Sequence, residues 1–327
     1  VNDSTDNLEA SYSLKLVHKK NKFKNTFSYN KLLIERAATD YEKTKTNYFG
    51  YRDAFNFLGE FNFNLDNKIV YGIDSEFDAS KYPKDYSGGD MREHDEGIIS
   101  QYFDLQLRPF EKLYSTFGLR SDDHTTVGRK TSGRVTAAYI LDGNSKIRSS
   151  FGAGVRFPAM YDYIYGSSTI VDKGGTLEEL QSERGLSFDL GYDTFLNNLD
   201  LGLNITYFKT EQKNPLFSNA RTDWVMRNGT GRNTSEGVEF NANWKPTNSK
   251  FGLNFGYTFT DSYDASTCDP DELASYADNE CRLTGNKVAK AKVRVPRHAV
   301  ETNISYSMNQ NLKSFLKGKY IGETRDF

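Results

Sequence analysis

Alternation of apolar and polar residues is the feature that most constrains the fold of this chain. In the stretch LDLGLNITYF, residues 199–208, leucine, isoleucine or tyrosine occupies every second position, and polar or small residues lie between them. Successive side chains of a β-strand point to opposite faces, so the stretch predicts a strand with one apolar and one polar face. The apolar face must pack either against a protein core or against lipid.

The same alternation recurs along the whole chain, and helical periodicity is nearly absent. Clear examples are IISQYFDLQLR at residues 98–108 and FGLNFGYTFT at residues 251–260. The pattern predicts about fourteen strands. They are expected at residues 11–20, 23–36, 51–64, 68–79, 98–108, 113–123, 132–141, 146–156, 184–196, 199–212, 233–245, 250–264, 297–307 and 312–321.

The predicted connections fall into two kinds. Those after the odd-numbered strands are short and carry Asn, Asp, Gly or Pro, as tight turns do. Those after the even-numbered strands are predicted to be long, from about 8 to about 30 residues. Short and long connections therefore alternate, which places all long loops at one end of the strands. This arrangement is typical of an antiparallel, up-and-down transmembrane β-barrel of a bacterial outer membrane.

The composition favours lipid over a protein core as the partner of the apolar face. Only 37% of the 327 residues are hydrophobic, and no run of apolar residues is long enough for a transmembrane helix. Barrel strands need apolar residues only at alternate positions. A soluble β-sandwich is the alternative, but its Greek-key connections would not sort loop lengths by end. We expect Asn204 and Thr206 to face a wet lumen, and Trp244 and Phe251 to flank a short turn at a membrane interface.

The strand count places both ends of the chain on the long-loop side. Outer-membrane barrels normally begin and end on the opposite, periplasmic side, and an open sheet edge leaves unpaired backbone groups in lipid. We therefore expect residues 1–327 to form one incomplete barrel domain, with strands missing at both ends. Such a chain alone is expected to aggregate or misinsert and to show no uptake.

Several stretches resemble, in order, the late barrel of TonB-dependent outer-membrane receptors. They are SSFGAGVRFPAMYDYIYGSS at 149–168, LQSERGLSFDLGYD at 180–193, NTSEGVEFNANWKP at 233–246 and VPRHAVETNISYSMNQNL at 295–312. In the second stretch, Leu180, Glu183 and Gly191 match the family pattern, whereas Ser182 stands where proline is usual. The resemblance covers about residues 146–327, and it rests on the order and spacing of the motifs.

The resemblance implies a 22-strand plan, of which this chain would supply about 14 strands without the plug domain. It implies TonB-energised uptake of a scarce nutrient complex across the outer membrane of a Gram-negative bacterium. The motifs are most similar to the vitamin B12 (cobalamin) and siderophore branch. TonB, the plug and the lipid bilayer are the implied partners. A passive porin and a surface adhesin remain alternatives, and a net charge of −2 gives no case for nucleic acid.

Charged residues at the polar strand positions must face water or a plug, because charge is costly in lipid. In the family such a lining holds the plug, and in a porin it would line a channel. The predicted lumen-facing set is Glu60, Asp74, Glu76, Asp104, Arg108, Arg120, Arg134, Arg148, Arg156, Asp189 and Glu239.

The sequence predicts a ligand mouth but no catalytic site. The mouth residues are Arg156, Tyr161, Tyr163, Tyr165 and Trp224. Aromatic side chains stack equally well on corrin, catechol or sugar, so they select no substrate class. The histidines are predicted to be scattered solvated or lumen residues without metal-ligand spacing, and we expect no enzyme. They are His18, His94, His124 and His298.

Cys268 and Cys281 enclose DPDELASYADNE in the longest loop. Two cysteines in an external loop in an oxidising compartment predict a disulfide. The acidic residues between them could hold Ca²⁺, although a solvated acidic loop without EF-hand spacing is the favoured alternative.

Overall fold

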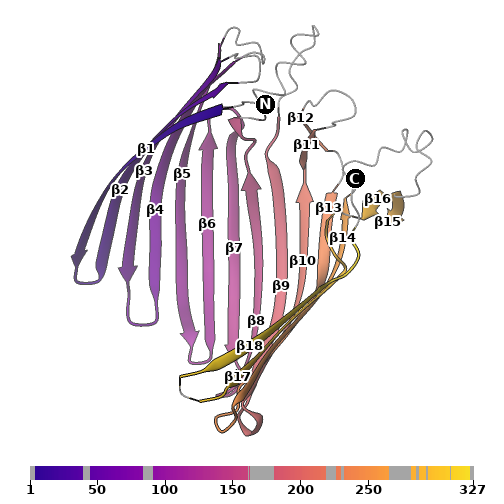
Figure 1. The fold of residues 1–327 in the computed structure, drawn as a ribbon. Coiled ribbons are helices and arrows are strands. Elements are labelled where there is room, and N and C mark those ends of the chain that lie inside the picture. Colours follow the sequence, from indigo (N-terminus) through magenta and orange to yellow (C-terminus); the bar gives the residue numbers. More distant parts are fainter. Residues whose placement is uncertain are drawn as a thin grey trace.

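The computed structural model consists of one large, strongly curved antiparallel sheet and a separate two-stranded sheet (Figure 1). It describes residues 4–39, 45–83, 91–160, 162, 180–218, 226–229, 232–264, 281–284, 287–291, 294–309 and 311–324. Fourteen long strands follow one another in chain order, and each pairs with the next. The predicted all-β, up-and-down architecture is confirmed. No helix in the described residues is long and apolar enough to cross a membrane.

The bounds of the fourteen long strands agree closely with the predicted ranges at the short-turn ends. They are β1 (Ser4–Lys20), β2 (Phe23–Thr39), β3 (Lys45–Asn62), β4 (Lys68–Pro83), β5 (Met91–Phe110), β6 (Leu113–His124), β7 (Gly128–Ile140), β8 (Ser145–Arg156), β9 (Glu183–Leu196), β10 (Leu201–Lys213), β13 (Arg232–Trp244), β14 (Phe251–Asp264), β17 (His298–Ser307) and β18 (Lys313–Ile321). The smaller elements are β11 (Leu216–Ser218), β12 (Met226–Asn228), β15 (Cys281–Thr284), β16 (Lys287–Ala291) and the 3-10 turn η1 (Asn197–Leu199).

Several strands extend further towards the long loops than the alternation predicts. β3 begins at Lys45 instead of residue 51, and β5 begins at Met91 instead of residue 98. The added stretch MREHDEG of β5 has no apolar face, yet its backbone pairs fully with β4. Pairing satisfies backbone groups whatever the side chains are. The alternation therefore marks only the part of each strand that has an apolar face.

The connection after β6 corrects the predicted alternation of short and long loops. The sequence predicts a long loop at residues 124–131, but only three residues separate β6 from β7. The backbone N–H groups of Thr126 and Val127 donate to Nδ1 of His124 at 3.2 and 3.4 Å. Gly128 closes the turn at a φ of +72°, which glycine adopts without strain. A histidine takes the capping place of the usual Asn or Asp, so the sequence lacks a familiar turn signal.

One face of the sheet is apolar across the middle of the strands. Residues directly opposite each other in an antiparallel pair share a face, and the register joins Ile205 to Phe240 and Phe240 to Tyr257. Ile205 is 48% exposed in the chain. Trp244 and Phe251 lie on the same face beside the short turn between β13 and β14, as expected.

Charged side chains return to the apolar face near its long-loop end, where they pair across strands. Lys31 Nζ lies 3.0 Å from Asp53 Oδ2, and Lys209 Nζ lies 3.1 Å from Glu236 Oε2. In both clusters the tyrosine two residues before the lysine hydrogen-bonds to the same carboxylate. About ten tilted residues separate each cluster from the nearest short turn, which gives a band roughly 25 Å tall, as in outer-membrane barrels.

The opposite face is polar and carries most of the buried side chains. Among the described residues, Leu180 is the only buried residue of the types Leu, Ile, Val, Met, Phe, Tyr and Trp. By contrast, Ser100 is 1% exposed, Glu183 3% and Thr206 5%. The described part of the sheet thus has no apolar core of the kind that a soluble β-sandwich requires.

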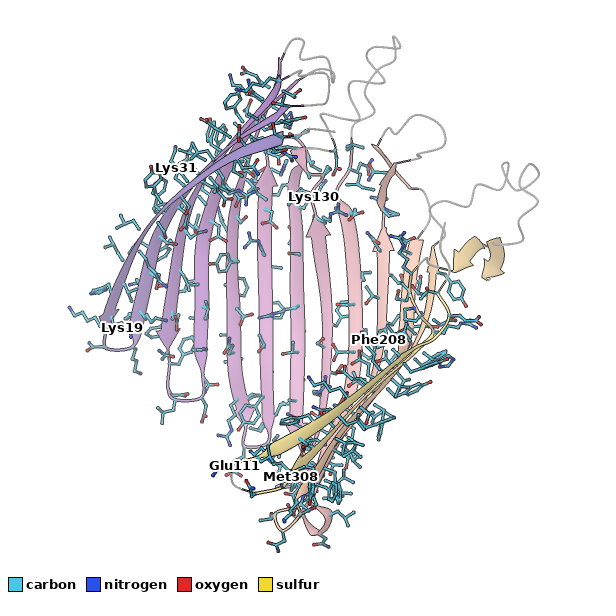
Figure 2. The ribbon with its side chains drawn as sticks, in the orientation of Figure 1. Lys19, Lys31, Glu111, Lys130, Phe208 and Met308 are labelled. Carbon is cyan, nitrogen blue, oxygen red and sulfur yellow. The ribbon has the colours of Figure 1, made fainter. Side chains whose placement is uncertain are left out.

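The polar face is the concave one. Arg134 on β7 contacts Asp104 on β5, and Arg148 on β8 contacts Thr206 on β10, each across an intervening strand. Side chains of alternate strands converge in this way on the inside of a curved sheet, and Figure 2 shows the side chains along both surfaces. We call this face the lumen face. β1 and β18 are its two edges, and they do not pair with each other in the described residues.

Candidate functional site: the lumen face

The charged residues predicted to face the lumen all lie on the lumen face, and most of them form ion pairs, either with one another or with further residues of the wall. Arg52 on β3 makes the most complete pair. Its Nε and Nη2 donate to Oδ1 and Oδ2 of Asp78 at 2.7 and 2.6 Å, and its Nη2 lies 3.1 Å from Glu76 Oε1. A fork of two parallel hydrogen bonds is the strongest arginine–carboxylate geometry. The charge of Arg52 is therefore compensated within the wall.

A second cluster lies nearer the short turns, between β4 and β6. Arg120 Nε donates to Asp122 Oδ1 at 2.7 Å, and its Nη1 donates to Asp74 Oδ2 at 3.1 Å. The guanidinium also lies over the ring of Tyr102, 5.4 Å from its centroid, in a cation–π contact. This cluster joins three neighbouring strands without leaving the arginine charge unpaired.

Glycines allow arginines to reach across a strand. Arg148 Nη2 donates to Thr206 Oγ1 at 2.7 Å by passing over Gly191. A Cβ atom at Gly191 would lie 2.8 Å from Arg148 Cζ, so only glycine leaves room for this path. Arg134 passes over Gly118 in the same way. These contacts connect strands that are not adjacent in the sheet, β8 to β10 and β7 to β5.

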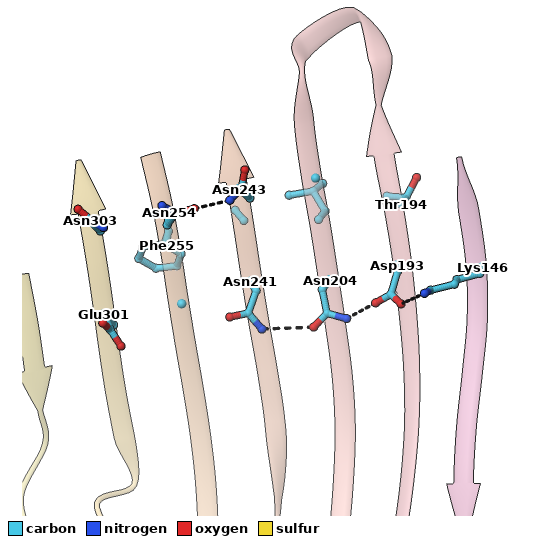
Figure 3. Close-up of a pocket in the computed structure, with 14 residues that line it drawn as sticks. Lys146, Asp193, Thr194, Asn204, Asn241, Asn243, Asn254, Phe255, Glu301 and Asn303 are labelled. Atoms are coloured by element: carbon cyan, nitrogen blue, oxygen red, sulfur yellow. Dashed lines mark hydrogen bonds and ion pairs between the residues drawn. The ribbon is translucent and has the colours of Figure 1, made fainter. Parts of the chain in front are cut away.

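The lumen face from β9 to β14 is lined largely by amides near the short turns (Figure 3). Asn241 Nδ2 donates to Asn204 Oδ1 at 3.2 Å, and Asn204 donates in turn to Asp193. Further along, Asn243 donates to Asn254. Amides offer both donors and acceptors without net charge. This part of the wall can exchange hydrogen bonds with water, a plug or a passing solute.

At the long-loop end, the chain that follows β8 folds back over the lumen face of β4 to β6. The ring of Phe157 stacks on His124 with centroids 4.7 Å apart, and Ser80 Oγ donates to Met160 Sδ at 3.5 Å. Pro158 is fully buried, and Asp162 is 6% exposed. We call residues 157–160 together with 162 the mouth segment. The mouth segment follows β8, but it packs against β4 and β6, which are not adjacent to β8 in the sheet.

Of the predicted ligand-mouth residues, the structure describes Arg156. Its Nη1 lies 2.7 Å from Glu183 Oε2, and Glu183 Oε1 accepts the backbone N–H of Leu216 at 2.6 Å. Arg156 therefore anchors the start of the mouth to β9 and β11. The remaining predicted residues lie outside the described residues: Tyr161, Tyr163, Tyr165 and Trp224. Their role stays a prediction.

The acidic loop between the cysteines also stays a prediction. Cys268 lies outside the described residues, and only the backbone of Cys281, at the start of β15, is described. The disulfide and the possible Ca²⁺ site are therefore neither confirmed nor contradicted.

The prediction that the histidines are scattered is wrong for two of them. Nε2 of His94 lies 3.8 Å, and Nε2 of His124 3.6 Å, from Oε2 of Glu96. His94 and Glu96 share a face because they are two residues apart on β5, and the register of β6 brings His124 alongside. The sequence shows that His94 and Glu96 are two residues apart, which places them on the same face of a strand. The sequence does not show the proximity of His124, because it predicts a long loop after β6.

These features define a class of protein. A curved antiparallel sheet with an apolar convex face and a charged, polar concave face is the wall of a transmembrane β-barrel of the outer-membrane type. The sequence matches the family model described as TonB dependent receptor-like, beta-barrel, over residues 1–327. The chain belongs to this family. No curated protein matches the sequence significantly.

Solved structures share the fold at low sequence identity. The siderophore receptor PirA from Acinetobacter baumannii is 15% identical with a TM-score of 0.68, and the match covers 98% of this chain and 52% of that one. The FrpB iron transporter from Neisseria meningitidis is 15% identical with a TM-score of 0.71, and the match covers 96% of this chain and 52% of that one. The ferric-catecholate import receptor Fiu from E. coli K12 is 12% identical with a TM-score of 0.68, and the match covers 98% of this chain and 54% of that one. The chain thus spans about half the length of these proteins.

Proposed function

We propose that this chain is the barrel portion of an outer-membrane receptor that imports a scarce nutrient complex, most specifically an iron–siderophore complex, with energy supplied through TonB. The observation that carries the proposal is the family match over residues 1–327. The names of similar solved structures, a siderophore receptor and a ferric-catecholate import receptor among them, support the substrate class. The expected location is the outer membrane of a Gram-negative bacterium.

The lumen face supports passage of a polar solute beside a movable plug. Its arginines are paired with carboxylates of the same wall, as at Arg52 and Arg120. A plug that shifts along such a wall leaves these arginines paired, whereas an unpaired buried charge would be costly. The amides around Asn204 and Asn241 add hydrogen-bonding capacity without charge. Receptor and transporter roles, as in the family, fit this wall better than a catalytic role.

Uptake by the full-length protein tests the proposal. A strain that lacks its own receptors would express the gene and be offered radioactive iron on catecholate or hydroxamate siderophores, with labelled cobalamin and oligosaccharides alongside. We expect saturable uptake of an iron–siderophore complex that disappears when TonB is deleted. Saturation follows from a specific site, and TonB dependence follows from a plug that must be moved.

Other outcomes would contradict the proposal in distinguishable ways. Uptake that rises linearly with concentration and persists without TonB would identify a porin. Binding of cells to a surface without uptake of any labelled compound would identify an adhesin. Saturable, TonB-dependent uptake of cobalamin alone would keep the receptor and change its substrate class.

A further inference from the structure

The mouth segment lies against a titratable cluster to which the proposed function assigns no role. At its centre is Glu96, which is largely buried and faces the lumen. The charged and titratable groups around it come from every element packed against it. They are Arg52 on β3, Glu76 and Asp78 on β4, His94 on β5, His124 on β6 and Asp162 in the mouth segment.

The cluster lies beyond the apolar band, on the side of the long loops. Ile99 on β5 and Leu119 on β6 are large apolar side chains at the long-loop edge of the apolar band on the convex face. Glu96 and His124 come after them, level with charged convex-face residues such as Asp123. The cluster is therefore in contact with the aqueous medium outside the band and responds to its pH.

The hydrogen bonds of His124 determine where its proton lies. Its Nδ1 accepts the backbone N–H groups of Thr126 and Val127, so the neutral ring carries its proton on Nε2, which is directed towards Glu96. A metal ion would need that nitrogen without its proton. The described residues also contain no group of three side chains placed to bind a metal ion. The Nε2–H group of neutral His124 therefore lies beside the carboxyl group of Glu96.

Glu96 is the group that titrates near neutral pH. Burial, followed by the charge of Asp78, raises the pKa of Glu96 to about 7, and Asp162 adds to the rise. Burial lowers the pKa values of His94 and His124 from the usual 6.5. Above pH 6.5, therefore, both histidines are predominantly neutral, and Glu96 is the member of the cluster that changes charge most.

We propose that Glu96 acts as a proton-operated latch for the mouth segment. When protonated, it lets Phe157, Met160 and Asp162 dock on β4 to β6. When ionised, it repels the carboxylate of Asp162 and favours release of the segment. The latch is a property of the barrel itself and does not rest on the proposed transport function.

The direction of the pH effect follows from linkage. Docking brings Asp162 towards Glu96 and raises the pKa of Glu96, so the docked state binds a proton more tightly and low pH must favour docking. Docking should weaken as the pH rises through about 7. Below 6.5 the two histidines oppose it, because burial disfavours their charged forms. The clean window for a test therefore lies between pH 6.5 and about 8.5.

Disulfide trapping measures docking directly. In the full-length protein, with its native cysteines replaced by serine, Ser80→Cys and Met160→Cys join two positions whose Oγ and Sδ atoms lie 3.5 Å apart. Ser235→Cys with Ser262→Cys, whose Oγ atoms lie 2.6 Å apart across β13 and β14, is the matched control for thiol ionisation. We expect the yield relative to the control to fall about two-fold from pH 6.5 to 8.5, which corresponds to a pKa of Glu96 of about 7 in the docked state and a coupling of about half a pKa unit.

Two variants make the test decisive. Glu96→Gln fixes the neutral state, so the relative yield should stay high at every pH between 6.5 and 8.5. Asp162→Asn removes the repelled charge and should raise the yield at pH 8.5. If Glu96→Gln does not assemble, Asp162→Asn provides the test in its place. A relative yield that is independent of pH with Glu96 in place would overturn the latch. The latch would also be excluded if Glu96→Gln kept the pH dependence and His124→Gln abolished it.

Discussion

Replacement of Gly237 by alanine is expected to prevent the barrel from assembling. Gly237 lies on the lumen face of β13, where the ring of Phe208 covers it (Figure 2 labels Phe208). A Cβ atom there would lie 2.8 Å from Phe208 Cζ and would overlap the carbonyl oxygen of Phe259. The ring can move, but the backbone oxygen belongs to the neighbouring strand. The ladder between β13 and β14 would have to shift, at a cost of about 3 kcal/mol.

The matched control is Gly154→Ala. Gly154 lies on the lumen face of β8, and a Cβ atom there would meet nothing within 4 Å. We expect this variant to assemble at the normal level. The measurement is the fraction of full-length protein in the outer membrane that resists unfolding by detergent until boiled. Equal fractions for Gly237→Ala and Gly154→Ala would show that the close approach at β13 is not required.

Arginine on the convex face of β10 is expected to be far more disruptive than arginine on the lumen face. Ile205 lies in the middle of the apolar band, whereas Asn204 lies beside Asp193 on the lumen face. A charge at the bilayer midplane costs about 2–4 kcal/mol on the lipid-facing side of a barrel. Asn204→Arg keeps its charge in water next to a carboxylate and should cost less than about 1 kcal/mol.

Urea unfolding of the full-length variants in lipid vesicles gives this difference directly. Ile205→Arg should unfold at a clearly lower urea concentration than Asn204→Arg, with the same dependence on urea. If Asn204→Arg were the less stable variant, the two faces of β10 would be assigned the wrong way round. If the two variants were equally stable, neither face would contact lipid.

Alternation allows the faces of the strands to be predicted, because a period of two is an intrinsic property of extended backbone. LDLGLNITYF predicts that Ile205 and Asn204 lie on opposite faces, and the register of β10 confirms it. Where a segment lacks the alternation or a usual turn residue, the sequence pattern does not predict its structure. In MREHDEG the strand continues without an apolar face, through backbone pairing and a cross-strand ion pair between Lys81 and Glu93. At His124 a side chain closes a turn that has no Asn or Asp.

Contacts across two strands could not be predicted from the pattern. Arg148 reaches Thr206 because the sheet is curved and because Gly191 leaves a gap between them. Neither curvature nor the direction of a long side chain is encoded in an alternation of apolar and polar letters. The same holds for the mouth segment, since only the curved geometry of β4 to β8 brings Phe157 to His124.

The assignment of faces predicts that the apolar face of the sheet contacts lipid and that the polar face encloses water, and spin labelling of β10 tests both predictions together. Nitroxides would be placed one at a time at residues 201–209 of the full-length protein in lipid bilayers. Collisions with oxygen, which concentrates in lipid, should peak at odd-numbered positions such as 205, and collisions with a water-soluble nickel chelate at even-numbered ones such as 204. Equal access of the chelate to both sets, or the opposite phase, would contradict a lipid-facing barrel wall.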